Sequence, residues 1–378
     1  MTTPGPVPPR DLDWIRSQLQ LAVELECSTL PLYLAALFSL EVQNYTAYNQ
    51  IRSVAMEEMV HMAIAANMLS ALGGSPRIKG IKLAFPAQGL AGGVEPDLRV
   101  GLAKLSMPQL VNFLRIEEPA FLLEQRQRDA AYPTIASFYR EIRNAIQANA
   151  DAVRAAVQRG GPSNQVGDDI GFMVIKATAG GDSVGQLLSG LDEILEQGEG
   201  TSSATLLAGD GSEGELSHYA KFATLYYGRD YQDVSVTEIT PETEPLFFRG
   251  RPLHWPKVIN TLAVPSDGYA KLLALDPASA AVAKDLTAFD SAYSGILAGL
   301  DVAWNGPADG AWKTLGGTVD VMMHMRVLSC FNIIRHEVPG ALVAQLGALY
   351  PDEAAFLSTY TDASQPVFYG PRFANTNV

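Results

Sequence analysis

The chain is constrained most by two short motifs in which a glutamate stands three residues before a histidine. Only five histidines occur in the 378 residues, and two of them end such a motif, Glu58–His61 and Glu215–His218. Both motifs lie in segments with helical periodicity, and residues three apart share one face of an α-helix. An isolated pair of this kind is usually a solvated surface pair. Two pairs on two helices predict instead a metal site built between helices.

Apolar residues recur at helical spacing through most of the chain, and strand patterns are rare. Glycine and proline mark the ends of the predicted helices, as at Gly73-Gly74. The predicted fold class is therefore mainly α. The predicted helices occupy residues 11–42, 46–72, 106–124 with a bend at Pro119, 133–160, 183–197, 213–227, 277–303, 317–336 and 351–360.

The chain divides into three predicted regions. Residues 1–10 contain four prolines and are expected to form a mobile N-terminal arm. Residues 11–230 hold the two motifs and are expected to form a helical bundle. Residues 231–378, which begin in a proline-rich irregular stretch, are expected to be partly helical and to pack on that bundle.

Four-helix bundles that bind two metal ions take one glutamate from each of two helices and a Glu-x-x-His pair from each of the other two. This chain has both pairs, and its other two helices carry the remaining carboxylates. The first helix has Glu24 and Glu26, and the third has Glu117 and Glu118. The order of these groups matches the bundle arrangement, but the spacing alone leaves the choice within each glutamate pair open.

Several stretches resemble known helical metalloproteins. The run ECSTLPLY, from Glu26 to Tyr33, and the run from Arg52 to Gly74 resemble the first two helices of bacterioferritin and other ferritin-like proteins. The stretches FLRIEEP, EILEQGEGT, ELSHYAKF and QPVFYGPRF resemble more closely the ferritin-like domain of the iminophenylpyruvate dimer synthase family, from bisindole pigment biosynthesis. The resemblance is weaker after residue 230. It implies a ferritin-like four-helix bundle with extra helices.

The resemblance also implies which glutamates bind metal. It favours Glu26 over Glu24, Glu58 over Glu57, and Glu117 over Glu118, while the choice between Glu117 and Glu118 stays close. Cys27 and Glu118 depart from the family, which more often has His and Arg at these positions. Tyr33 is expected to be a core tyrosine near the metals. The predicted metal-binding and catalytic set is Glu26, Glu58, His61, Glu117, Glu215 and His218.

A set rich in carboxylates with two imidazoles suits two iron ions, or manganese in their place. Glu26, Glu58 and His61 would bind one ion, and Glu117, Glu215 and His218 the other, with Glu58 and Glu215 bridging. The predicted function is an O2-activating oxidase or oxygenase. Its expected partners are O2, a small organic substrate and an external electron donor. The resemblance implies an amino-acid-derived secondary metabolite as substrate, and residues 228–378 are expected to wall its pocket.

Two other functions fit the same motifs. One is iron handling as a ferroxidase, without an organic substrate. The other is a non-catalytic binding module in which the metals only staple the helices together. A substrate-sized cavity beside the metals would favour the enzyme, and a site closed on all sides would favour the staple.

Composition excludes several further classes. The net charge of −14 argues against nucleic-acid binding, since an acidic chain is repelled by phosphates. The two cysteines, Cys27 and Cys330, are too few for a disulfide framework. No uninterrupted apolar run approaches the roughly 18 residues of a membrane span, and the N-terminus lacks the pattern of a secretory signal. A cytoplasmic protein is therefore expected. Roughly 150 residues beyond the last motif should prevent closed-shell assembly, so a small homo-oligomer is also expected.

Overall fold

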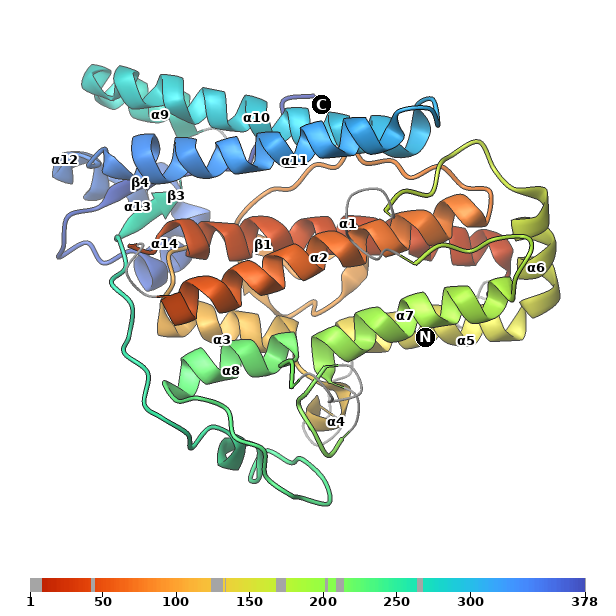
Figure 1. Ribbon diagram of the computed structural model, residues 1–378. Helices are drawn as coiled ribbons and strands as arrows, with labels where there is room; N and C mark the ends of the chain where they lie inside the picture. The colour runs from red at the N-terminus through yellow and green to blue at the C-terminus, as the bar shows by residue number, and fades with distance from the viewer. Residues whose placement is uncertain are drawn as a thin grey trace, which may run out of the picture.

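The computed structural model describes residues 9–41, 45–123, 132, 134–167, 175–200, 203–208, 214–263 and 268–377. Helices dominate the described residues, which confirms the mainly α class (Figure 1). They form three layers, with one long helix pair in the middle. Residues 1–8 of the predicted N-terminal arm lie outside the described residues, and the predicted boundary near residue 230 stays a prediction.

The middle layer is the helix pair α1 (Leu12–Phe38) and α2 (Tyr45–Ala71). The Asp11 side chain caps α1 by accepting hydrogen bonds from the backbone N–H groups of Asp13 and Trp14. Gly73 follows α2 with a positive φ of 82°, a conformation that ends helices and favours glycine. By length and composition α1 could cross a membrane, but 78% of its most apolar window is buried inside the protein. Its apolar residues therefore serve as core.

Two interrupted helical rods pack on one face of this pair (Figure 1). One rod is α3 (Met107–Ile116) followed by α5 (Ile135–Ala148), and the other is α7 (Ser183–Glu199) followed end to end by α8 (His218–Tyr227). The short helices α4 (Ala120–Leu123) and α6 (Ala150–Arg159) belong to the connections. Together with α1 and α2, the two rods make the four-helix bundle that the motifs predicted.

The interruptions shorten three of the predicted helices. The helix predicted through Pro119 ends at Ile116, because residues preceding a proline disfavour helical backbone angles. The helix predicted over 133–160 is divided at Asn149. The helix predicted from residue 213 begins only at His218, because the Ser217 side chain accepts a hydrogen bond from Ala220 N–H and so caps a new helix there.

The third layer covers the opposite face of α1 and α2 (Figure 1). It is formed by α10 (Ala280–Asn305) and α11 (Ala311–Val327), with α9 (Gly268–Leu275) beside them. The predicted helix over 317–336 loses regular α geometry after Val327, where a π turn and a 3-10 turn follow. The remaining short helices are α12 (Gly340–Val343), α13 (Leu346–Leu349) and α14 (Ala354–Tyr360).

Strands are few and short, as the sequence predicted. An antiparallel pair is formed by β1 (Ala87–Gln88) and β2 (Arg99–Val100), with Ala87 opposite Val100. A parallel pair is formed by β3 (Thr261–Ala263) and β4 (Phe368–Gly370), with Leu262 opposite Tyr369. The second pair joins the irregular stretch after α8 to the C-terminal residues.

Asn67 is a buried polar contact between the middle layer and the third layer. Its side chain is fully buried on α2. Its Oδ1 accepts hydrogen bonds from Val166 N–H at 2.9 Å and from Trp304 Nε1 on α10 at 3.0 Å, and its Nδ2 donates to Val166 O at 2.8 Å. One amide thus joins α2, a connecting loop and the third layer.

We expect Asn67→Ala to lower the free energy of unfolding by about 3 kcal/mol, because it leaves buried donors and an acceptor without partners. Urea denaturation measures the effect. Asn144→Ala is the matched control, since Asn144 is exposed on α5, and its effect should be small. Equal losses from the two variants would contradict the role of Asn67.

Candidate metal centre

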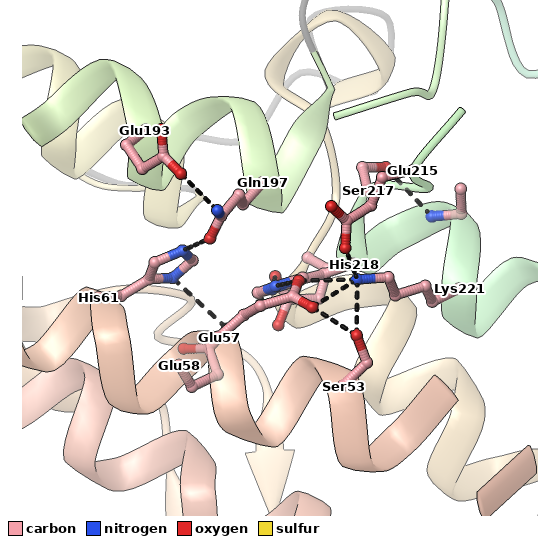
Figure 2. Close-up of polar contacts among 12 residues, drawn as sticks. Ser53, Glu57, Glu58, His61, Glu193, Gln197, Glu215, Ser217, His218 and Lys221 are labelled. Atoms are coloured by element: carbon pink, nitrogen blue, oxygen red, sulfur yellow. Dashed lines mark hydrogen bonds and ion pairs between the residues drawn. The ribbon is translucent and has the colours of Figure 1, made fainter. Parts of the chain in front are cut away.

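Three buried side chains from two helices offer metal ligands at one point between the middle layer and the rods. The ligand atoms of Glu58, His61 and His218 lie within 4.8 Å of one another. The carboxylates of Glu26 and Glu117 complete the cluster, and all five side chains are at most 6% exposed. Figure 2 shows His61, Glu58 and His218 approaching one another from α2 and α8.

Each of the five residues is placed by a different feature of its helix. Glu26 lies near the middle of α1, and Glu58 and His61 lie one turn apart on α2. Glu117 is the residue that ends α3, and His218 is the first residue of α8. The two rods are therefore interrupted at the cluster, and their helix ends supply two of its side chains.

Glu58 is the shared member of the cluster. Its Oε1 lies 2.8 Å from Nδ1 of His218 and 3.9 Å from Nδ1 of His61. Glu26 Oε2 lies 4.0 Å from His61 Nδ1, and Glu117 Oε2 lies 3.4 Å from His218 Nδ1. Each imidazole thus faces Glu58 and one further carboxylate. The two rings are 5.3 Å apart and nearly parallel.

Both imidazoles present Nδ1 to the carboxylates, because the Nε2 atom of each ring contacts a side-chain oxygen outside the cluster. His61 Nε2 lies 2.8 Å from Gln197 Oε1, and His218 Nε2 lies 2.9 Å from Glu57 Oε2 (Figure 2). Gln197 donates its own amide N–H to Glu193, which turns its oxygen toward His61. Acceptors at Nε2 favour the tautomer with the proton on Nε2, which leaves a lone pair on Nδ1 for a metal.

Nδ1 of His218 is buried and has no hydrogen bond of good geometry among the described residues. A buried ring nitrogen without such a hydrogen bond, facing the carboxylates of Glu58 and Glu117, is typical of a metal ligand. The donor set of three carboxylates and two imidazoles fits iron(II) or manganese(II).

The pKa values of the cluster residues favour bound protons on several of the side chains. Burial raises the pKa of Glu26 and of Glu117, and the charge on Glu58 raises both further. Burial lowers the pKa of His61 to about 4. For His218 the effect of burial is outweighed by Glu117, Glu57 and Glu58, so its pKa is raised well above the usual value. Divalent cations would displace these protons and relieve the crowding of carboxylates.

Two buried tyrosines orient carboxylates of the cluster. Tyr33 donates its phenolic hydrogen to Glu117, and Tyr139 donates to Glu26. Both rings are fully buried. Tyr33 was expected near the site because it lies on α1, seven residues after Glu26. Tyr139 comes from α5, and no motif around it indicated a role.

Glu215 lies apart from the other five predicted residues. It precedes α8 instead of lying on it, so the predicted spacing of one helical turn to His218 is wrong. Its side chain is 53% exposed, and its carboxylate contacts Lys221 Nζ at 3.4 Å. Glu57 instead contacts His218, and Lys221 and Ser53 hold Glu57 in place (Figure 2). Burial raises the pKa of Glu57, but the contacts with His218 and Lys221 lower it below its usual value overall.

Of the close pair on the third helix, Glu117 contacts His218, whereas the neighbouring Glu118 is buried outside the cluster. Sequence reasoning missed Gln197, Tyr139 and Lys221. The stretch EILEQGEGT, which contains Gln197, and ELSHYAKF, which contains Lys221, had been singled out for their resemblance, without a role for these residues.

Glu199 joins the interrupted segments next to the cluster. It is the last residue of α7, and its carboxylate accepts hydrogen bonds from Ala120 N–H at 2.9 Å and from Arg140 at 3.3 Å. It therefore connects α7, α4 and α5 where both rods are broken. Burial raises the pKa of Glu199 to about 7, despite the opposing effect of Arg140.

Comparison with known proteins agrees with this architecture. The family model described as ferritin-like matches residues 19–227, more than half of the chain. A ferritin-like protein from Caulobacter vibrioides, solved at 1.95 Å resolution, superposes with a TM-score of 0.54 at 21% identity. The match covers 87% of this chain and 97% of the other, and at this identity it shows the fold alone. No curated protein is significantly similar in sequence.

We expect Glu199→Gln to gain stability over the wild type as pH rises. In the folded protein the pKa of Glu199 is about 7, above its ordinary value of 4.5. The stability that the bound proton contributes is therefore fully present below pH 4.5 and is lost as pH rises from 4.5 to about 7. Gln keeps an uncharged acceptor and avoids that loss. In metal-free protein the gap between the two should widen by up to roughly 3 kcal/mol from about pH 5 to about pH 8.

Urea denaturation at the two pH values measures this gap. Glu196→Gln, on the same helix and partly exposed, is the matched control. A Glu199→Gln gap of equal size at both pH values would show that the carboxyl does not titrate in this range.

Proposed function

Because the chain belongs to the ferritin-like family, we propose that its buried cluster is a dinuclear metal centre and that the protein is an O2-activating oxidase or oxygenase. Iron is the proposed metal, with manganese as the closest substitute. The superfamily includes enzymes that use two iron ions in this way. The proposed substrate is a small organic molecule.

The observation that carries the proposal is the matched pair of imidazoles. Each presents Nδ1 to Glu58 and to one further buried carboxylate, while its Nε2 is held by Gln197 or Glu57. Structural side chains seldom adopt such an arrangement, because it crowds three buried carboxylates around two buried imidazoles. Two cations between the rings would satisfy all five groups.

The residues divide naturally between two ions. Glu26 and His61 would hold one, Glu117 and His218 would hold the other, and Glu58 lies between the two imidazoles and would bridge them. When bound, two such ions supply electrons for the reduction of O2. Glu58 and Glu215 are both predicted bridges in the sequence, and this proposal keeps Glu58 as the single bridge and leaves Glu215 out, because its side chain is half exposed.

The residues around the proposed ligands fix their orientation and balance their charge. Tyr33 and Tyr139 hold one oxygen of Glu117 and of Glu26, which limits how far each carboxylate can turn. Glu57 holds the Nε2 proton of His218, and Lys221 balances the charge of Glu57. The burial of all five ligands excludes bulk water from the reacting groups.

The substrate class rests on resemblance. The stretches that resemble the iminophenylpyruvate dimer synthase family support an amino-acid-derived substrate, and an external electron donor is part of the proposal. This finer part of the proposal stays a prediction.

A second function is favoured by one observation. The cavity walled by the C-terminal helices α10 and α11 lies against the opposite face of α1 and α2, and none of the five cluster residues lines it. The predicted substrate pocket beside the metals is thus not the one these helices form. A closed centre is what a metal staple would have, so the tests below separate the staple, and also iron storage, from the oxidase.

We expect about two transition-metal ions per chain after loading with Fe(II) under anaerobic conditions. Glu58→Ala and His218→Ala should lose most of this metal, because they remove a bridge and a terminal ligand. Glu215→Ala is the matched control and should keep it, since its carboxylate is half exposed against Lys221. Metal analysis measures all four proteins, and a Glu215→Ala loss as large as that of Glu58→Ala would contradict the five-residue centre.

We expect loaded protein to consume O2 in a single turnover unless a reductant and a substrate are supplied. With excess Fe(II) and O2, iron retention should stay near two per chain. An oxygen electrode and iron analysis of the desalted protein measure both quantities. Retention of tens of irons would support iron storage, and bound metal that raises thermal stability without consuming O2 would support the staple.

A further inference from the structure

An apolar cavity of about 320 Å³ lies between the middle layer and the third layer, on the face of α1 and α2 that turns away from the metal centre. Its walls come from α1, α2, α10 and α11, and nearly all are apolar side chains. The volume is at the lower end of the range for pockets that bind small molecules. The apolar side chains that line a cavity of this size forgo packing contacts with one another, so such a cavity in a close-packed protein requires a reason.

Cationic groups gather at one end of the cavity. Arg52 and Arg326 both line it, and the Arg326 guanidinium lies 5.0 Å from the ring centroid of Tyr48. Arg52 is one helical turn beyond Tyr48 on α2. Within the described ranges, neither arginine has an ion pair with a carboxylate. Two arginines that line one cavity are notable in a chain with a net charge of −14.

The other end of the cavity is apolar and closed. Trp304, near the end of α10, lines it and is fully buried, with its Nε1 donating to Asn67. Along α2 the lining runs from Tyr48 to Ala63, roughly 22 Å at 1.5 Å per residue. The cavity is therefore elongated, with positive charge at one end and an aromatic wall at the other.

The side chains between the two ends are adaptable. Six methionines line the cavity, and their unbranched, polarisable side chains adjust to the shape of a flexible guest. Val319 and Met323 on α11 also line it and are 37% and 57% exposed, so the cavity opens to solvent at this helix. The six methionines are Met56, Met59 and Met62 on α2 and Met322, Met323 and Met325 on α11.

We propose that this cavity binds a free monocarboxylic acid with a flexible apolar chain. The carboxylate pairs with Arg52 and Arg326, and the chain extends past the methionines toward Trp304. Charge complementarity selects an acid over a neutral lipid, and the length and apolar lining select an acyl chain over a compact polar metabolite. The site is separate from the metal centre, so the proposal does not depend on the proposed oxidase function.

Isothermal titration of the metal-free protein with dodecanoate and with dodecan-1-ol tests the proposal. We expect dodecanoate to bind at one site per chain and more tightly than the alcohol. The double variant Arg52→Gln/Arg326→Gln should weaken dodecanoate binding by about tenfold and leave the alcohol unchanged. Arg159→Gln, an exposed arginine at the end of α6, is the matched control and should bind as the wild type does.

A second variant tests the position of the chain. Leu34 lines the cavity from α1, and Leu34→Trp should fill its middle and abolish binding of both the acid and the alcohol. Circular dichroism and the thermal unfolding midpoint, compared with those of the wild type, establish that this variant is folded. Wild-type affinity in folded Leu34→Trp, or an equal loss of acid and alcohol binding in the double arginine variant, would overturn the proposal. A wild-type protein that binds no dodecanoate would also overturn it, and sedimentation of that protein as a dimer would indicate that a second copy covers the opening at α11.

Discussion

The structure depends on the burial of three carboxylates against two imidazoles in the middle of a helical bundle. Removing Glu26, Glu58 and Glu117 from water is costly unless each is neutralised or paired. Protons perform this task in the metal-free protein, as the raised pKa values of Glu26, Glu117 and His218 indicate. Hydrogen bonds fix the orientations of these buried groups, so the cluster adopts one defined geometry. The hydrogen-bond partners are Gln197, Glu57, Tyr33 and Tyr139.

The broken rods follow from the same requirement. A continuous fourth helix would carry Glu215 and His218 on one face, whereas the cap at Ser217 starts α8 at the cluster itself. The N-terminal end of α8 then faces Glu57 and Glu58, and the partial positive charge of a helix N-terminus stabilises carboxylates nearby. Glu199 holds the neighbouring breaks together by its contacts with Ala120 and Arg140. The interruptions are therefore part of how the centre is built.

The third layer gives the middle helix pair two different faces. Glu26, Glu58 and His61 lie on the face toward the rods, while Cys27, Met59 and Met62 lie on the face toward α10 and α11. Both α1 and α2 are consequently buried on most of their circumference, which explains why α1 is apolar enough to resemble a membrane span. The additional residues after α8 thus create a second internal environment, and none of the cluster residues lines its cavity.

Local sequence patterns predicted the features of the protein that depend on a single continuous helix. The mainly α class followed from helical periodicity, and the pairing of Glu58 with His61 followed from their spacing on α2, because residues three apart on an unbroken helix always share a face. The same rule failed for Glu215, since the cap at Ser217, two residues later, starts a new helix at His218. Glu57, Gln197 and Tyr139 reach the centre, and Arg52 and Arg326 meet at the cavity, only through the packing of distant segments. Periodicity carries no information about such contacts, so tertiary structure alone decided them.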